Sequence, residues 1–227
     1  MEPRRNVVEA LGVTRTLPGA VPVTLVRDID LTVAPGEFVA VTGPSGSGKS
    51  SLLYLLGLLD APSVGRVLLD GVDTSALSAD ELSQLRLAGI GFVFQFHFLL
   101  PEFTTRANVM IPMRKLGALD ERAIGKRADE ILASLDLADQ AHKHPGEMSG
   151  GQRQRAAIAR ALASEPALLL ADEPTGNLDT KNARIVFDIF RSLARERGKA
   201  VVTVTHDSSL AELATRRVHL VDGRIVD

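Results

Sequence analysis

Apolar and polar positions follow two different periods along this chain. Residues 6–42 are rich in strand-like sequence, and residues 23–33 alternate apolar and polar side chains as a half-buried strand does. Later runs are uniformly apolar, which is typical of strands buried on both faces. The runs that predict such strands are 38–42, 90–94, 168–171 and 200–205. Residues 66–69, followed by Asp70-Gly71, read as a further strand and its turn.

Helical patterns separate these strands. Residues 181–197 place Ile185, Ile189, Phe190 and Leu193 on one face, and Gly198 follows as a C-cap. Strands that alternate with helices predict a parallel α/β sheet. The helix-like stretch from about 100 to 160 interrupts this alternation and predicts an inserted helical subdomain. The other segments with helical composition are 51–56, 78–87, 104–141 and 151–163.

Composition narrows the class of protein. The chain has 227 residues, 45% of them hydrophobic, which is enough for the core of one domain. Its 26 Lys and Arg against 28 Asp and Glu leave a net charge of −2, so we expect no nucleic-acid partner. The absence of cysteine excludes disulfides and thiolate metal sites, and it suits a reducing compartment.

The sequence shows neither a signal peptide nor a transmembrane segment. No apolar region follows residues 1–5 closely enough to form a signal peptide. The longest apolar stretch, residues 52–59, is far shorter than the ~20 residues that span a bilayer. We therefore expect a chain that does not cross a membrane by itself.

A glycine-rich loop carries the first chemical signal. Residues 43–51 match G-x-x-x-x-G-K-[ST], the phosphate-binding P-loop, with the strand 38–42 before it and the helix 51–56 after it. Backbone N–H groups of such a loop cradle phosphates, Lys49 can reach the β- and γ-phosphates, and the Ser50 hydroxyl can ligate Mg²⁺. We expect nucleotide contacts from Gly43, Pro44, Ser45, Gly46, Ser47, Gly48, Lys49, Ser50 and Ser51.

Two carboxylates end the apolar strand at 168–171. Asp172 fits the acid that holds hydrated Mg²⁺ beside the phosphates of a P-loop enzyme. Glu173 fits the carboxylate that polarises an attacking water. The alternative interpretation is a strand that ends in two solvated acids.

A second anion site is predicted directly before the helix at 151–163. Ser149, Gly150, Gly151 and Gln152 would place exposed N–H groups, a hydroxyl and the positive end of the helix dipole together. The alternative is an ordinary N-cap with a flexible glycine pair.

These motifs together resemble the nucleotide-binding subunit of ABC transporters. Residues 149–152 are similar to the signature motif of that family, with Met148 in place of the usual Leu. Gln95, Asp179 and His206 fall in family order between and after the motifs above. A P-loop alone would also admit GTPases, kinases and helicases.

The resemblance implies a fold and an assembly. It implies an α/β P-loop NTPase (RecA-like) core with a small antiparallel β subdomain and an inserted α-helical subdomain. Residues 1–95 and 161–227 would form the core and β subdomain, and residues 96–160 the helical subdomain with the signature. Two copies would pair head to tail, so that each ATP, bound with Mg²⁺, lies between one P-loop and the signature of the other copy.

The resemblance also implies residue roles. Gln95 would sense Mg²⁺ and the attacking water, Glu173 would be the catalytic base and His206 would contact the γ-phosphate. Asp179 would lie at the dimer interface. One position departs from the family pattern: Leu17 stands where an aromatic residue usually stacks on adenine, and residues 1–37 contain no Tyr, Trp or Phe.

An aromatic segment after Gln95 refines the resemblance. Five of the eight Phe of the chain lie at position 92 or within 94–103, and we expect Phe98 and Leu99 on a docking surface, with ordinary core packing as the alternative. This segment is similar to the lipoprotein-releasing (LolD-like) subclass. Residues 171–179 are also shared with macrolide-efflux and cell-division ATPases, so efflux of drugs or peptides stays open as a second function.

The resemblance places the chain in a membrane complex. Because the sequence stops at Asp227, we expect separate transmembrane permease subunits and a peripheral location on the cytoplasmic face of the inner membrane. A soluble ABC ATPase of DNA repair or translation is the remaining class. The repair proteins insert long coiled coils between P-loop and signature, and the translation proteins carry two ATPase units, whereas this chain has neither feature.

Overall fold

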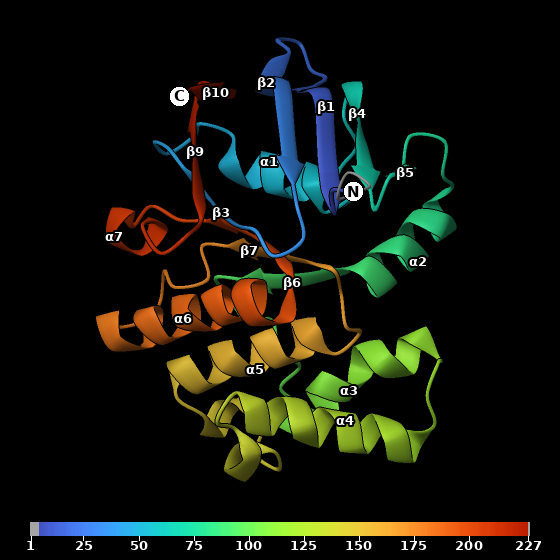
Figure 1. The fold of residues 1–227 in the computed structure, drawn as a ribbon, viewed down its shortest axis with the longest axis vertical. Coiled ribbons are helices and arrows are strands. Elements are labelled where there is room, and N and C mark those ends of the chain that lie inside the picture. The colour runs from blue at the N-terminus through green and yellow to red at the C-terminus, as the bar shows by residue number, and fades with distance from the viewer. Residues whose placement is uncertain (1–4, 227) are drawn as a thin grey trace.

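Two β-sheets of different kinds organise the computed structural model, which describes residues 5–226 (Figure 1). The larger sheet has the strand order β10-β9-β3-β8-β7-β6, and its strands are parallel except β10, which pairs antiparallel with β9. The strands are β3 (Phe38–Thr42), β6 (Ile90–Phe94), β7 (Leu168–Asp172), β8 (Ala200–Val204), β9 (Arg216–Val221) and β10 (Arg224–Val226).

The second sheet is antiparallel and lies on the other side of helix α1 (Lys49–Leu56) (Figure 1). Its strand order is β2-β1-β4-β5, and Leu52, Leu53, Leu55 and Leu56 of α1 are buried. Helix α1 contacts both sheets, so it joins them through a shared apolar layer. The strands are β1 (Val8–Leu17), β2 (Val23–Val33), β4 (Val64–Leu69) and β5 (Val72–Asp73).

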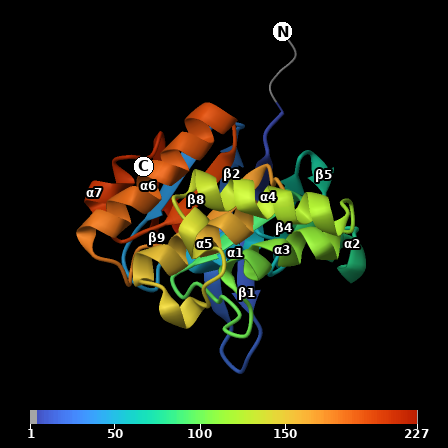
Figure 2. The ribbon, with the colours of Figure 1, turned by 90° about the horizontal axis from the view of Figure 1, so that it is seen from below.

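Helices cover the opposite face of the larger sheet. Figure 2, seen from the helical side, shows α4 and α3 side by side in front of the sheet, and α5 and α6 contact the sheet itself. Helix α2 leads from the smaller sheet to β6, and the short α7 follows β8. The helices are α2 (Ala79–Gly89), α3 (Thr105–Leu116), α4 (Glu121–Ser134), α5 (Gly150–Leu162), α6 (Thr180–Arg197) and α7 (Ser208–Ala211).

Strand residues divide between two apolar cores, which explains the uniformly apolar runs. Phe38, Leu169 and Val201 join the core on the side of α5 and α6, where Phe38 packs against Phe187 with ring centroids 5.9 Å apart. The residue that follows each of them along its strand joins the core around α1 instead. Each strand is thus buried on both faces, as parallel strands between helical layers are.

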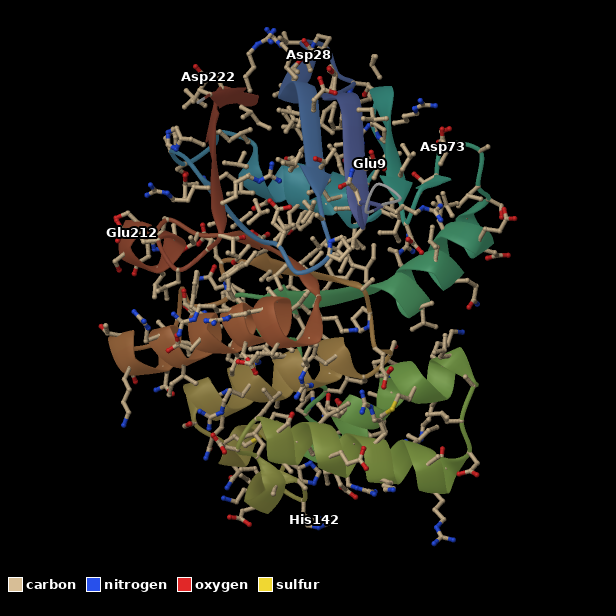
Figure 3. The ribbon with its side chains drawn as sticks, in the orientation of Figure 1. Glu9, Asp28, Asp73, His142, Glu212 and Asp222 are labelled. Atoms are coloured by element: carbon tan, nitrogen blue, oxygen red, sulfur yellow. The ribbon has the colours of Figure 1, made fainter. Side chains whose placement is uncertain are left out.

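Charged side chains lie outside these cores. Figure 3 labels acidic side chains around the periphery, and Asp28, Glu212 and Asp222 among them are exposed. Among residues 5–226, no helix combines the length and apolarity that a bilayer crossing requires.

Most predicted elements are confirmed, including the parallel sheet and the helical insertion at 104–141, which forms α3 and α4. The sequence pattern missed α7, β9 and β10 at 208–226. Exposed Arg217 and His219 alternate with buried Val218 and Leu220, so β9 lacks an apolar run. The subdomain boundaries at 95/96 and 160/161 stay a prediction, and α5 runs through the second of them without a break.

Residues 1–4 and 227 lie outside the described residues, so the expectations about the N-terminal segment and the end of the chain have no structural counterpart. Leu99 differs from expectation: it is 8% exposed and belongs to the helical core, whereas Phe98 is 61% exposed.

Candidate nucleotide site

The P-loop connects the end of β3 to the start of α1, as the sequence predicts. Gly48 is the N-cap of α1 and has a left-handed φ of 94°. A Cβ at this position would stand 2.2 Å from the carbonyl oxygen of Leu25 in β2, so only glycine fits. Strand β2 therefore runs close to the P-loop, and Leu25 is one of the residues beside it.

Lys49 holds the loop in shape. Its Nζ donates hydrogen bonds to the carbonyl oxygens of Gly43 at 3.0 Å and Pro44 at 2.7 Å. The hydroxyl of Ser47 is buried and has no hydrogen-bond partner among the described residues. Ser47 and Pro44 do not line the cleft beside the loop, whereas Lys49 does. A lysine ammonium in a glycine-rich loop at a helix N-terminus fits a polyanion such as a triphosphate.

Asp172 and Ser50 meet beside this loop. The Ser50 hydroxyl donates a hydrogen bond to Oδ1 of Asp172 at 3.0 Å. Burial raises the pKa of the Asp172 carboxyl, while hydrogen bonds from Ser50 and Tyr54 act in the opposite direction. One carboxylate and one hydroxyl are oxygen ligands of the kind that Mg²⁺ prefers alongside phosphate oxygens and water.

No cluster of three metal-ligating His, Cys, Asp or Glu side chains occurs within residues 5–226. A cation at Ser50 and Asp172 would therefore take its remaining ligands from the nucleotide and from water, which is the usual arrangement for Mg²⁺.

Glu173 and His206 face the P-loop from the ends of β7 and β8. Oε2 of Glu173 lies 3.4 Å from Nδ1 of His206. Glu173 has a left-handed φ of 45°, and its N–H donates to the carbonyl oxygen of Val204. An open cleft of about 500 Å³ brings these groups together. The residues that line it are Leu25, Gly43, Ser45, Gly46, Gly48, Lys49, Ser50, Ser51, Glu173 and His206.

Gln95 takes a different position. It follows β6, whose last residue Phe94 pairs with Asp172. Its Nε2 donates to Oδ1 of Asn177 at 3.3 Å, and it packs against Gly176, so the side chain engages the loop after Glu173. Gln95 is not part of the cleft lining described above.

The second predicted anion site is built as an N-cap. Ser149 and Gln152 form a reciprocal capping box at the start of α5: the N–H of Gln152 donates to Ser149 Oγ at 3.2 Å, and the N–H of Ser149 donates to Gln152 Oε1 at 2.8 Å. These residues do not line the P-loop cleft of the same chain.

The two glycines of this cap have different surroundings. A Cβ at Gly151 would stand 2.2 Å from Oδ1 of Asn182, whose Nδ2 donates to Asp179 at 2.8 Å. A Cβ at Gly150 would meet only Leu178, at an ordinary 3.7 Å. Gly151 is therefore required by packing within the chain, which neither interpretation of the sequence anticipated, whereas a methyl group at Gly150 would fit without a clash.

Leu17 lies at the end of β1 and is 39% exposed. It does not line the P-loop cleft, whereas Leu25 does. The sequence does not predict that Leu25 lies beside the P-loop. The two segments are 18 or more positions apart, and a strand sequence does not show which of its apolar residues will approach a distant loop.

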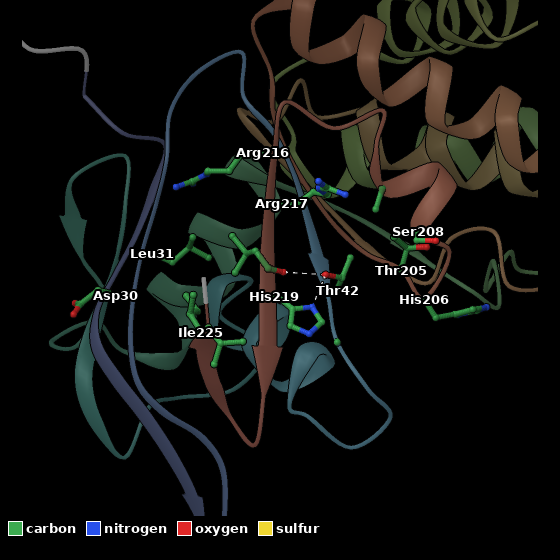
Figure 4. Close-up of a pocket in the computed structure, with 14 residues that line it drawn as sticks. Asp30, Leu31, Thr42, Thr205, His206, Ser208, Arg216, Arg217, His219 and Ile225 are labelled. Carbon is green, nitrogen blue, oxygen red and sulfur yellow. Dashed lines mark hydrogen bonds between the residues drawn. The ribbon is translucent and has the colours of Figure 1, made fainter.

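A second hollow of about 960 Å³ adjoins the cleft at Gly43 and His206 (Figure 4). Thr42 Oγ1 lies 3.0 Å from Nδ1 of His219, and Figure 4 shows Arg216 and Arg217 on the same strand, β9. Arg216 is paired with Glu37 at 2.8 Å, so this hollow carries less free positive charge than its composition indicates.

Comparisons with known proteins agree with this geometry. The family described as "ABC transporter" matches residues 26–176. The "Lipoprotein-releasing system ATP-binding protein LolD 1" of Rhodopseudomonas palustris is 49% identical over 97% of this chain and 98% of the relative. LolD of Anaeromyxobacter dehalogenans is 50% identical over 96% of this chain and 92% of the relative.

Solved structures give the same result. The dimeric, post-hydrolysis structure of the ATP-binding cassette MJ0796 bound to ADP and Pi has a TM-score of 0.89 and 41% identity, and covers 97% of both chains. This likeness confirms the predicted α/β P-loop NTPase fold with its antiparallel β and helical parts. The chain belongs to the ABC transporter family and is one of its ATP-hydrolysing, ATP-binding subunits.

Proposed function

We propose that this chain hydrolyses ATP to drive the release of lipoproteins from a membrane by an ABC complex. The observation that carries the proposal is the near full-length identity of 49% to a lipoprotein-releasing system ATP-binding protein. We further propose that the chain sits peripherally at the cytoplasmic face of the inner membrane, on separate transmembrane subunits.

The P-loop and Asp172 form the proposed nucleotide and Mg²⁺ site. Lys49, which lines the cleft, would shift part of its bonding from the loop carbonyls to the β- and γ-phosphates. Ser50 and Asp172 would hold Mg²⁺, which when bound neutralises phosphate charge. Burial raises the pKa of Asp172, so a cation beside its carboxyl group would stabilise the charged form.

Glu173 and His206 carry the proposed hydrolytic step. The Glu173 carboxylate would accept a proton from the attacking water, and His206 would hold the carboxylate and the γ-phosphate in line. Their 3.4 Å separation allows both groups to face one reacting atom. Gln95 would act through Asn177 and the loop 174–178, because its amide already bonds there.

A second copy of the chain supplies the missing half of the site in this proposal. Ser149, Gly150 and Gly151 do not line their own cleft, and no clash within the chain accounts for the glycine at position 150, since a Cβ there would make only an ordinary contact with Leu178. The structural relative MJ0796 is dimeric in two solved structures. A symmetric pair would put each signature over the P-loop of the other copy.

The test is genetic depletion in the source bacterium. Loss of the chain should leave outer-membrane lipoproteins in the inner membrane, and the wild-type gene should restore their sorting while the Glu173→Gln gene should not. Normal lipoprotein sorting combined with increased sensitivity to macrolides or peptides would replace lipoprotein release by efflux.

A further inference from the structure

The loop after β6 is held to helix α5 by side chains from one face of that helix. Gln154 Nε2 donates to the carbonyl oxygen of Phe94 at 3.1 Å. Arg160 donates to the carbonyl oxygens of Phe98 at 2.6 Å and His97 at 2.9 Å. These bonds fix the main chain of residues 94–98, where Phe98 adopts a left-handed φ of 46°.

The side chain of His97 connects this loop to a side chain of α5. Its Nε2 lies 2.9 Å from Nε of Arg153 in α5. A guanidinium can only donate, so the imidazole must be neutral and accept at Nε2. Burial lowers the pKa of His97, and the positive charges of Arg153 and Arg160 lower it further, which favours this neutral form.

The other end of Arg153 reaches the N-cap of α5. Its Nη1 donates to the carbonyl oxygen of Met148 at 2.5 Å. That carbonyl belongs to the peptide group that carries the N–H of Ser149. The side chain of Met148 is buried, and its sulfur accepts a hydrogen bond from Thr105 at 2.9 Å. The Met148–Ser149 peptide group is therefore held by Met148 on one side and by the hydrogen bond from Arg153 on the other.

The residues on either side of His97 face outward. Phe96 is 63% and Phe98 61% exposed, and their rings lie 6.5 Å apart. The ring of Phe98 also meets Phe94 edge-on at 5.5 Å. One short segment therefore presents two aromatic rings to a partner and turns the imidazole between them toward Arg153.

We infer that His97 and Arg153 form a positioning pair that ties the exposed Phe96 and Phe98 to the Ser149 cap of α5. A shift of the two aromatic rings moves His97, His97 moves the guanidinium, and the guanidinium moves the Met148–Ser149 peptide. The inference rests on the proposed function, because it assumes that this cap meets the nucleotide of a second copy.

Steady-state ATP hydrolysis by the purified full-length chain tests the pair. His97→Ala and Arg153→Ala should each raise the KM for ATP about five-fold, the scale of one lost hydrogen bond of ordinary net strength in a partly exposed place. The double variant should show the same five-fold increase and not their product, because one link is broken in each case. His97→Gln, whose amide oxygen can accept from Arg153, should return the KM to within about two-fold of wild type.

Arg122→Ala, the removal of an arginine at an exposed position of α4, is the control. It should leave the KM near the wild-type value. Melting temperatures within about 2 °C of wild type would exclude a general loss of packing. Three results would each overturn the inference: a double variant whose KM increase is the product of the two single increases, a wild-type KM for His97→Ala, or a His97→Gln variant that behaves like His97→Ala. A wild-type chain that hydrolyses no ATP would instead refute the proposed function.

Discussion

The carboxylate of Glu173 and the imidazole of His206 face each other at 3.4 Å from the ends of neighbouring parallel strands. The pairing of β7 with β8 sets this distance, and the left-handed backbone at Glu173 turns its side chain toward the P-loop cleft. The carboxyl ends of parallel strands are where open α/β sheets place reactive groups. Both side chains thus line the same cleft.

Glu173→Gln should bind ATP and fail to turn it over. The amide keeps the shape of the side chain but cannot accept a proton, so kcat should fall by roughly 10²- to 10⁴-fold. ATP should then hold the chain as a stable dimer, measured by sedimentation. Glu212→Gln, an exposed change beside α7, is the control. A variant that stays monomeric at saturating ATP would contradict the head-to-tail dimer.

Several residues of the predicted site come together in the structure because each motif lies at a strand end or a helix start. The P-loop, Asp172, Glu173 and His206 follow buried strands that the apolar pattern also reveals, and a parallel sheet brings such ends together. Leu25 and the Gly151–Asn182 contact could not be predicted, because they depend on how close two elements approach in space.

Strand β9 and Leu99 show the same limit in the fold. Strand β9 alternates exposed basic residues with buried apolar ones, and the alternation is too short to stand out from a loop. Leu99 lies among aromatic residues that look alike in sequence, yet it enters the helical core while Phe98 stays outside. The direction of each side chain is set by the left-handed turn at Phe98, which no composition rule indicates.

Lys49→Ala should abolish ATP hydrolysis, with a loss of at least about 100-fold in kcat/KM. The substitution removes the buried ammonium that fixes the loop through Gly43 and Pro44 and that would contact the phosphates. Lys115→Ala, at an exposed position of α3, should leave activity unchanged. Nucleotide binding measured by calorimetry separates lost affinity from lost turnover, and full activity of Lys49→Ala would refute the P-loop assignment.

Phe96→Ser and Phe98→Ser should impair transport by the complete membrane complex while ATP hydrolysis by the isolated chain stays within about two-fold of wild type. Exposed aromatic rings favour burial in an interface, and the nucleotide cleft does not include them. Val64→Ser, a change at an exposed apolar residue of the smaller sheet, is the matched control. Normal assembly and transport by both Phe variants would remove this surface from the interface with the membrane subunits.

His97 should make stability depend on pH. Its folded-state pKa is lowered by burial and by Arg153 and Arg160, so the unfolded chain binds a proton that the folded chain resists. Stability is then complete above about pH 6.5 and falls as the pH drops toward the folded pKa. Because the site is partly exposed, we expect the melting temperature of wild type to fall only about 1–2 °C more than that of His97→Gln between pH 7.5 and 5.5. Parallel pH curves for the two proteins would show that the charge of His97 is not suppressed.

Gly150→Ala and Gly151→Ala should separate packing from ligand contact at the cap of α5. A methyl at Gly151 would overlap Asn182, which Asp179 holds in place, so this variant should lose about 1–3 kcal/mol of stability through overpacking. A methyl at Gly150 meets only Leu178 at 3.7 Å, so the melting temperature should stay within about 1 °C of wild type or rise slightly, since alanine favours a helix.

Gly150→Ala, the more stable of the two variants, should be the one that loses function by blocking the ligand contact directly. The methyl at Gly150 would occupy the space left for a phosphate of the second copy, so this stable variant should lose ATP-driven dimerisation and hydrolysis. Thermal melting and sedimentation with ATP on the same two proteins measure both quantities. If Gly150→Ala dimerised and hydrolysed ATP as wild type does, the Ser149 cap would be a structural N-cap alone, and the second phosphate contact would have to come from elsewhere on the chain.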